Sequence, residues 1–360
     1  MAPGSFAFLV HSASAAHLAY WHPWLAQAPP VLLDKLVSPL LPLMPPGRPA
    51  RSVVFASPHG QAAGWLMALA GPVRPGDDRG LRRLLSRLLA AGRRAQTLGA
   101  RLLGIDPQAG LPDALLSRLS AHLDIALTNG KTYTVSAALE AALQAARRRG
   151  YTPLQAEFAV LGATGESGSV AARVLARHVR RLTLAGSAEV RLQHLAHRIM
   201  AETGLVVDFS TDLRRVAAAA HVVLNFDGTA ARRVQGDRLR PGAVVCDVPP
   251  PHAWASQLAR RRGDIEVLTG GLVAVPDQAF TPLPDHMTGG MPGVIPAAMA
   301  ETVILSLEGR SRAYSLGAGT DVARLDEIER LAARHGFRVA APRPVPDRGI
   351  SPWGAIGEDG

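Results

Sequence analysis

The chain has 360 residues, 48% of them hydrophobic and 19% charged, a composition typical of a globular protein large enough for two domains. Its 39 basic residues outnumber its 29 acidic ones, giving a net charge of +10, but the arginines are scattered and aromatic residues make up only 5%. Surfaces for stacking nucleic-acid bases are therefore scarce, and we do not expect a nucleic-acid-binding protein.

Two strands are predicted early in the chain, at 6–12 and 51–57, and two long helices at 79–103 and 133–149. The N-terminus has no basic start before its apolar run, which favours a strand over a signal peptide. A single cysteine, Cys246, excludes an intrachain disulfide framework and a cysteine-based metal cluster, so we expect no metal site and a cytoplasmic protein. No run of 18 apolar residues predicts a membrane span.

From residue 158 onward, short apolar strands alternate with helices, which is typical of a parallel sheet covered on both faces. We therefore predict a two-domain α/β protein whose C-terminal part contains a Rossmann doubly wound parallel sheet. A substrate and catalytic domain is expected at 1–150, with helices of about 294–340 returning to it. An NADP-binding Rossmann domain is expected at 151–293, and a flexible tail at 341–360.

A glycine-rich loop, "GATGESGS", lies between a predicted strand and a predicted helix. Gly162 permits a tight turn, Gly165 a close approach of the backbone to phosphates, and Gly168 close packing of helix on strand. The helix start offers unpaired N–H groups to a pyrophosphate. We predict that this loop binds a dinucleotide. The residues between these glycines that we assign to the same cofactor site are Thr164, Glu166 and Ser167.

The end of the next predicted strand favours NADP over NAD. An NAD site usually places an acidic residue there to bind the ribose 2′-hydroxyl. Gly186 and Ser187 occupy this position instead, and Arg191 lies one turn into the following helix. A hydroxyl and a guanidinium suit a 2′-phosphate, so we assign Ser187 and Arg191 to cofactor binding.

Lys131 is one of only two lysines, in a chain whose other basic residues are arginine. Its "GKT" is not a phosphate-binding P-loop, because that motif needs glycine where Ile125 stands. A lysine can lose its proton and arginine cannot, so Lys131 is a candidate general acid or carbonyl polariser facing a nicotinamide. An ordinary exposed loop lysine is the alternative.

Five segments, in order, carry a resemblance to a known family: "TNGKTYT", "GATGESGS", "LTGGLV", "IPAAMAETVILSLEG" and "RHGF". Together they resemble the cyanobacterial-type long-chain acyl-[acyl-carrier-protein] reductases and, more distantly, shikimate and amino-acid dehydrogenases. The resemblance implies NADPH as reductant and a fatty acyl thioester on an acyl carrier protein as substrate and partner. We also expect Gly270 and Gly271 of "LTGGLV" to leave room for the nicotinamide.

Two departures change the expected chemistry. The family carries an acyl-accepting cysteine where this chain has Ala298, and a loop asparagine where it has Lys131. Alanine is no nucleophile. We therefore predict direct hydride transfer to or from a carbonyl, hydroxyl or imine, with a catalytically silent NADP-binding or carrier-binding protein as one alternative. A true acyl reductase that uses Cys246 is the other.

Two acidic residues complete the candidate site. Asp247 ends a predicted strand at the edge where such sheets bind ligands, and we assign it a catalytic or cofactor contact. Glu301 stands in an apolar helix and is either a buried hydrogen-bonding group or part of a solvated face. A homo-oligomer remains open.

Overall fold

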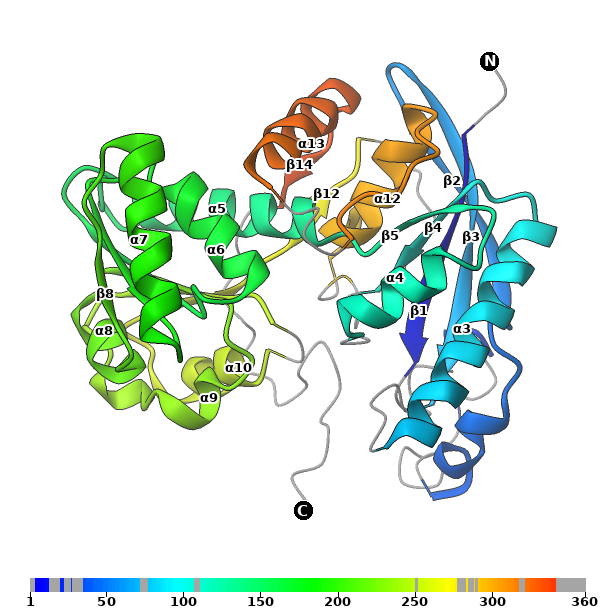
Figure 1. The fold of residues 1–360 in the computed structure, drawn as a ribbon, viewed down its shortest axis with the longest axis horizontal. Coiled ribbons are helices and arrows are strands. Elements are labelled where there is room, and N and C mark those ends of the chain that lie inside the picture. The colour runs from blue at the N-terminus through cyan, green and yellow to red at the C-terminus, as the bar shows by residue number, and fades with distance from the viewer. Residues whose placement is uncertain are drawn as a thin grey trace.

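The computed structural model describes residues 4–12, 20–22, 27, 35–71, 77–106, 111–249, 252–276, 283, 288, 291–316 and 321–340. Two lobes flank a long central helix (Figure 1). The predicted tail at 341–360 lies outside the described residues. In the described part of the chain, no helix combines the length and the apolar character needed to cross a membrane.

The first lobe contains a five-stranded sheet in the order β2-β3-β1-β4-β5, in which β2 is antiparallel to β3 and the other neighbours are parallel. Its strands are β1 (Gly4–Ser12), β2 (Ala50–Ser57), β3 (Gly60–Ala70), β4 (Leu102–Ile105) and β5 (Ala126–Thr128). Its helices are a 3₁₀ helix η2 (Ser38–Leu43), α3 (Asp78–Thr97) and α4 (Asp113–Ser120).

The sequence analysis found β1 and β2 in this lobe but missed β3, β4, β5 and α4. Strand β3 is rich in alanine and glycine, which have low strand propensity, so it carries no β signal of its own. The helix predicted at 79–103 is too long, since α3 ends at Thr97. Gly99, at φ +83°, turns the chain before β4 begins.

The second lobe contains six parallel strands in the order β11-β10-β9-β6-β7-β8. The strands are β6 (Glu157–Leu161), β7 (Arg181–Ala185), β8 (Asp208–Ser210), β9 (Val222–Asn225), β10 (Val244–Asp247) and β11 (Glu266–Thr269). Counted from β6, this order is 3-2-1-4-5-6 read from the β8 edge, which is the Rossmann order for dinucleotide binding. The predicted Rossmann doubly wound sheet is therefore confirmed.

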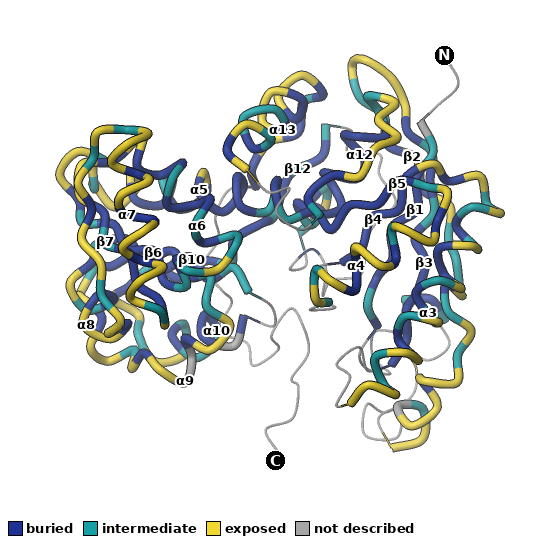
Figure 2. The backbone as a smooth tube through the Cα atoms, viewed as in Figure 1, coloured by how far each residue is buried: buried dark blue, intermediate teal, exposed yellow. Residues whose placement is uncertain are grey.

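Helices cover both faces of this sheet. They are α6 (Glu166–Leu175), α7 (Glu189–Thr203), α8 (Leu213–Ala219), α9 (Ala230–Arg233), the 3₁₀ helix η4 (Gly236–Arg238) and α10 (Ala253–Arg261). The central helix α5 (Lys131–Arg148) leaves the first lobe after β5 and packs against α6, β9 and β10 of the second. Its buried alanines let these neighbours approach closely, so α5 is a shared part of both cores (Figure 2).

The chain then returns to the centre. A small sheet in the order β13-β12-β14 follows, made of β12 (Leu272–Ala274), β13 (Val294–Pro296) and β14 (Arg338–Val339). Helix α12 (Ala297–Leu307) packs against β1, β4 and α5, and α13 (Val322–His335) packs against α5 and α12. These contacts bring residues far apart in the sequence beside the start of α5.

Candidate functional site

The glycine loop follows β6 at the point where the strand order of the Rossmann sheet reverses. Gly162 has φ +77°, and a Cβ there would lie 2.8 Å from the backbone N of Asp227, in the loop after β9. A Cβ at Gly168 would lie 2.2 Å from the Gly162 carbonyl oxygen. Gly165 has more room, because the nearest atom to its Cβ would be that same carbonyl at 3.3 Å. Packing thus requires glycine at 162 and 168, while Gly165 leaves an exposed backbone at the start of α6.

The loop after β7 lies beside the glycine loop. Gly186 is buried, and a Cβ there would lie 2.7 Å from Cγ2 of Thr164. Ser187 and Arg191 are both exposed: Ser187 lies in the loop after β7, and Arg191 lies on the first turn of α7. No acidic side chain stands at the last residue of β7 or directly after it. Binding of a cofactor by these residues stays a prediction.

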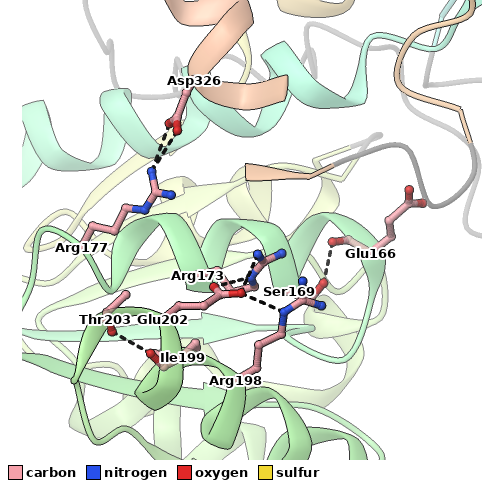
Figure 3. Close-up of polar contacts among 9 residues, drawn as sticks. All are labelled: Glu166, Ser169, Arg173, Arg177, Arg198, Ile199, Glu202, Thr203 and Asp326. Atoms are coloured by element: carbon pink, nitrogen blue, oxygen red, sulfur yellow. Dashed lines mark hydrogen bonds and ion pairs between the residues drawn. The ribbon is translucent and has the colours of Figure 1, made fainter. Parts of the chain in front are cut away.

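Helix α6 is held firmly behind the glycine loop (Figure 3). Arg173 of α6 donates two hydrogen bonds of 2.7 Å to Glu202 of α7, which also accepts one from Arg198 at 2.9 Å. These arginines lower the pKa of Glu202. Arg177 pairs with Asp326 of α13 at 3.1 Å. These contacts fix the C-terminal end of α6, the end away from the glycine loop, relative to α7 and α13.

Lys131 is the first residue of α5. Gly130 before it has φ +69°, and a Cβ there would lie 2.2 Å from Cα of Ala298, so α12 lies directly on this loop. The side-chain oxygen of Asn129 accepts a hydrogen bond from the Lys131 N–H at 3.2 Å, which forms a local turn just before α5, whose N-cap residue is Gly130. The Asn129 Nδ2 is buried with no hydrogen-bond partner among the described residues, so it is a donor available to a bound molecule.

The Lys131 ammonium lies between two carboxylates from different lobes. Its Nζ is 2.6 Å from Oδ1 of Asp113, at the start of α4, and 3.1 Å from Oε2 of Glu166, at the start of α6. All three side chains are between a quarter and a third exposed. Burial and a hydrogen bond to Asp113 raise the pKa of Glu166, and the Lys131 charge opposes this shift. This cluster can hold and move protons beside the glycine loop.

Sequence reasoning missed Asp113. It follows a proline, belongs to no motif, and stands 18 positions from Lys131, so only the fold brings them together. Glu166 was found through the glycine loop, but its contact with Lys131 was not.

Glu301 is completely buried and fixes the Lys131 loop to α12. Its carboxylate accepts hydrogen bonds from the Tyr133 N–H at 2.9 Å, the Ser315 hydroxyl at 2.8 Å and the Thr128 hydroxyl. Burial raises its pKa, and the Thr128 hydrogen bond is the largest effect that opposes the rise. Of the two readings of Glu301, the structure shows the buried hydrogen-bonding group, and its role is to position residues 128–133.

Asp247 is buried at the end of β10, with both oxygens in use. Oδ1 accepts a hydrogen bond from Asn225 Nδ2 at 2.7 Å, and Oδ2 accepts one from the Ala255 N–H at 3.0 Å. Burial raises its pKa to about 6. Asn225 in turn accepts a hydrogen bond from the Asp227 N–H, beside Gly162. These contacts favour a positioning role in the crevice, and a catalytic role for Asp247 stays a prediction.

Cys246 is completely buried between β10 and α5. Its thiol lies 3.7 Å from the carbonyl oxygen of Ala138, and burial raises its pKa far above the ordinary value. A reactive cysteine needs a thiolate and access to substrate. We therefore assign Cys246 no nucleophilic role, against the alternative raised from the sequence.

Gly270 and Gly271 pack against α5. A Cβ at Gly270 would lie 2.8 Å from Cβ of Ala138, and one at Gly271 would lie 3.0 Å from Cγ2 of Thr134. Close approach of the helix therefore accounts for both glycines without a ligand. Their contact with a nicotinamide stays a prediction.

No family model matches the chain. The aminotransferase PigE of Serratia sp. (strain ATCC 39006) is 34% identical over 102 residues, which are 28% of this chain and only 12% of that protein. The matched segment is thus a small part of both proteins.

Several solved structures are similar at low identity. Quinate dehydrogenase from Corynebacterium glutamicum in complex with NAD aligns at 17% identity and a TM-score of 0.35, covering 73% of this chain and 87% of that one. The 5-ketofructose reductase of Gluconobacter sp. strain CHM43 aligns at 13% identity and a TM-score of 0.36, covering 91% of this chain and 99% of that one. L-tryptophan dehydrogenase from Nostoc punctiforme aligns at 14% identity and a TM-score of 0.33, covering 74% of this chain and 69% of that one.

These values are too low to carry an argument about activity, and none of the four proteins is a long-chain acyl-[acyl-carrier-protein] reductase. The sheet order and the glycine loop instead define the class, a two-lobed α/β protein with a Rossmann sheet in its second lobe.

Proposed function

We propose that this protein is an NADP(H)-dependent oxidoreductase that transfers hydride to or from a carbonyl, hydroxyl or imine substrate where the two lobes meet. One observation carries the proposal. The glycine loop stands where the strand order of the Rossmann sheet reverses, and Glu166, directly after Gly165, forms an ion pair with Lys131, which follows the last strand of the other lobe. A dinucleotide bound by the loop therefore has an ionisable group beside it.

The residues of the loop fit the pyrophosphate of such a cofactor. Gly165 presents bare backbone at the start of α6, where unpaired N–H groups and the positive end of the helix dipole favour an anion. Gly162 and Gly168 keep the helix close to the strand. Thr164 lies on the same loop and Ser167 on the first turn of α6, and both would contribute hydroxyl groups.

When bound, the nicotinamide supplies hydride in reduction or accepts it in oxidation. In reduction, Lys131 donates a proton to the substrate oxygen or nitrogen while the carbon receives the hydride, and in oxidation it takes that proton back. Asp113 and Glu166 orient the ammonium and relay the proton to and from solvent. Asn129 Nδ2 offers a further donor to the substrate. We assign Asp247 the role of positioning the loop after β9.

The cofactor preference proposed is NADP. An acidic side chain at the end of β7 would repel a 2′-phosphate, and this position holds Gly186 and Ser187 instead. Ser187 is exposed, and its neighbour Gly186 has no side chain, so the Ser187 hydroxyl suits a contact with the ribose or its phosphate.

A catalytically silent NADP-binding protein, or one that binds an acyl carrier protein, is the second candidate. It is favoured by Ala298, which stands where the resembling reductases carry their nucleophile and which is buried against Gly130. The excess of arginine would complement an acidic carrier protein.

Titration of the purified protein with NADPH and with NADH, followed by coenzyme fluorescence, tests the proposal. Tighter binding of NADPH is expected, and aldehydes, ketones, imines or hydroxy acids should change the coenzyme absorbance. Binding without turnover on such a panel would favour the silent protein. Failure to bind either coenzyme would overturn the assignment.

A further inference from the structure

A second cluster of reactive side chains lies at the first lobe, away from the Lys131 loop. Ser57 ends β2, and the tight turn that follows it leads into the first residue of β3 (Figure 1). Lys131 instead follows the last residue of β5, and β3, β1, β4 and β5 run parallel to one another. The two places therefore lie at opposite ends of these strands. We propose that Ser57, His335 and Glu308 form a nucleophilic triad that hydrolyses small activated esters, an activity separate from the proposed function.

Three segments far apart in the sequence meet in this triad. The Ser57 Oγ lies 2.9 Å from Nδ1 of His335, the last residue of α13. Nε2 of the same ring lies 2.8 Å from Oε1 of Glu308, which directly follows α12. The His335 side chain is 2% exposed and that of Glu308 16%, so both are held in place by their surroundings. A nucleophile, a base within hydrogen-bond distance and a third group that orients the base are the arrangement that activates a serine.

The Glu308 carboxylate decides which ring nitrogen of His335 acts as the base. An ionised carboxylate only accepts hydrogen bonds, so a neutral His335 carries its proton on Nε2. Nδ1 is then unprotonated and accepts the hydrogen bond from the Ser57 hydroxyl. The Gly60 carbonyl, 3.2 Å from Ser57 Oγ, is a second acceptor for this hydroxyl once His335 is protonated. Arg334 donates to Glu308 at 3.1 Å and so helps to fix the carboxylate.

The turn after β2 leaves the serine open to solvent on one side. Ser57 is partly exposed, and Pro58, His59 and Gly60 are exposed. A Cβ at Gly60 would meet no atom within 4 Å, so an acyl group has room beside the turn. The His59 ring, whose centroid lies 6.0 Å from that of the His335 ring, can donate to an oxyanion formed there. An open site encloses little of its substrate, so esters with a small acyl group and a good leaving group fit it best.

The reaction is an acyl transfer to the serine followed by hydrolysis. Ser57 Oγ forms a bond to the carbonyl carbon of the ester, and its proton passes to His335 Nδ1. The bond from that carbon to the leaving oxygen then breaks, and the leaving alcohol takes the proton from His335. Water attacks the acyl group on Ser57 in the same two steps and releases the acid. Glu308 stabilises the imidazolium each time.

Labelling of the whole chain with a fluorophosphonate, followed by mass spectrometry of the digest, tests the proposal. We expect one adduct, on Ser57, and none in Ser57→Ala. His335→Gln should slow labelling by roughly 10²-fold or more, the usual effect of losing a general base. Glu308→Gln keeps an acceptor for Nε2–H but loses the charge, so labelling should slow roughly tenfold or more. With p-nitrophenyl acetate, the same variant should lower kcat and leave KM unchanged.

Ser52→Ala is the matched control, because Ser52 is an exposed serine of the same strand. It should be labelled at the wild-type rate. His335 is buried, so unfolding of His335→Gln would also abolish labelling, and a further variant separates the two effects. Ser57→Cys leaves His335 and Glu308 in place, and the native Cys246 is buried. The new thiol should react with iodoacetamide at pH 7 roughly tenfold faster than free cysteine, because His335 takes up its proton.

Three results would each overturn the triad. They are an unlabelled Ser57 in the folded wild type, a thiol in Ser57→Cys that reacts no faster than free cysteine, and equal labelling rates in wild type and Glu308→Gln. Binding of NADPH should be the same in wild type and in all these variants, since the triad lies away from the glycine loop. Failure of the triad therefore leaves the proposed function intact, and failure to bind a coenzyme leaves the triad intact.

Discussion

Lys131 Nζ and Glu166 Oε2 lie 3.1 Å apart, and each belongs to the first residue of a helix. The lysine opens α5, which starts in the first lobe, and the glutamate opens α6, which follows the glycine loop of the second. A positive charge at a helix start is unfavourable on its own, because it opposes the helix dipole. The ion pairs with Asp113 and Glu166 offset this cost. They hold the lysine side chain where the two lobes meet.

Replacing Lys131 by Met should separate catalysis from cofactor binding. Met fills similar space but carries no proton, so turnover should fall by roughly 10²- to 10⁴-fold, the usual effect of losing a general acid. NADPH affinity should change little, since the loop and not the lysine holds the coenzyme. Steady-state kinetics and fluorescence titration give the two values.

Lys35→Met is the control, because Lys35 is exposed and is the chain's other lysine. Its turnover should equal that of the wild type. Equal turnover in the Lys131→Met protein would end the catalytic assignment of this residue.

Alanine substitutions at Gly165 and Gly168 should distinguish packing from ligand approach. Gly165 has φ −80°, and a Cβ there meets nothing closer than 3.3 Å, so Gly165→Ala should fold with a free energy of unfolding within about 1 kcal/mol of wild type. The same methyl group stands where a pyrophosphate must approach, so NADPH affinity should fall tenfold or more.

Gly168→Ala is the contrasting variant, since its Cβ would overlap the Gly162 carbonyl oxygen at 2.2 Å. It should lower the melting temperature strongly. A Gly165→Ala protein that binds NADPH like the wild type would show that the pyrophosphate does not pass over this loop.

Glu301→Ala should destabilise the protein and the Lys131 loop together. It leaves the Thr128 and Ser315 hydroxyls and the Tyr133 N–H without their buried acceptor, a loss of about 3 kcal/mol or more in the free energy of unfolding. Glu301→Gln keeps one acceptor oxygen and should lose less. Urea unfolding measures both.

Turnover should follow the same order as stability, because the loop positions Lys131. Glu140→Gln, on the surface of α5, is the control and should match the wild type. Unaltered stability in Glu301→Ala would contradict the positioning role.

The sequence predicts those elements that depend on residues close together in the chain, and it fails for those that depend on residues far apart. The Rossmann lobe follows from local signals, because its apolar strands are separated by helices and turn residues, and the glycine loop stands between the first strand and helix. Strand β3 gives no such signal, since its alanines and glycines become a strand only when β1 and β2 pair with it on either side.

The site shows the same division. Lys131 was found because lysine is rare in this chain, but its partners Asp113 and Glu166 are 18 and 35 positions away and meet it only in the folded protein. Asp247 and Gly270 were placed at the correct edge of the sheet. Their surroundings depend on packing that no local pattern encodes. Asp247 contacts Asn225 and Ala255, and Gly270 contacts α5.

The Cys246 thiol should be inert in the folded protein. It is completely buried with a raised pKa, so a thiol reagent should label it only after denaturation. Cys246→Ala should keep its NADPH binding and turnover, with a loss of about 1 kcal/mol in stability for the smaller core side chain. Rapid labelling of the native protein, or a covalent acyl adduct on Cys246, would restore the acyl-enzyme route.

Asp247 should make the stability of the protein fall as the pH rises from about 4 to about 6. The pKa of this carboxyl is raised from 3.8 to about 6 in the fold by burial, so between these values the folded protein binds the proton and the unfolded chain does not. The stabilisation is complete below the unfolded pKa and is lost as the pH passes through the folded pKa. The full difference corresponds to about 3 kcal/mol.

Asp247→Asn removes the titrating group, so the free energy of unfolding of this variant should lack the fall between pH 4 and pH 6. The variant should be less stable than the wild type at pH 4, because the Asn amide cannot accept from both Asn225 and the Ala255 N–H. Urea unfolding at several pH values compares the slopes. Asp208→Asn, an exposed position on β8, should retain the wild-type slope. The same pH slope in Asp247→Asn and wild type between pH 4 and pH 6 would mean that the fold does not raise the pKa of this carboxyl above its value in the unfolded chain.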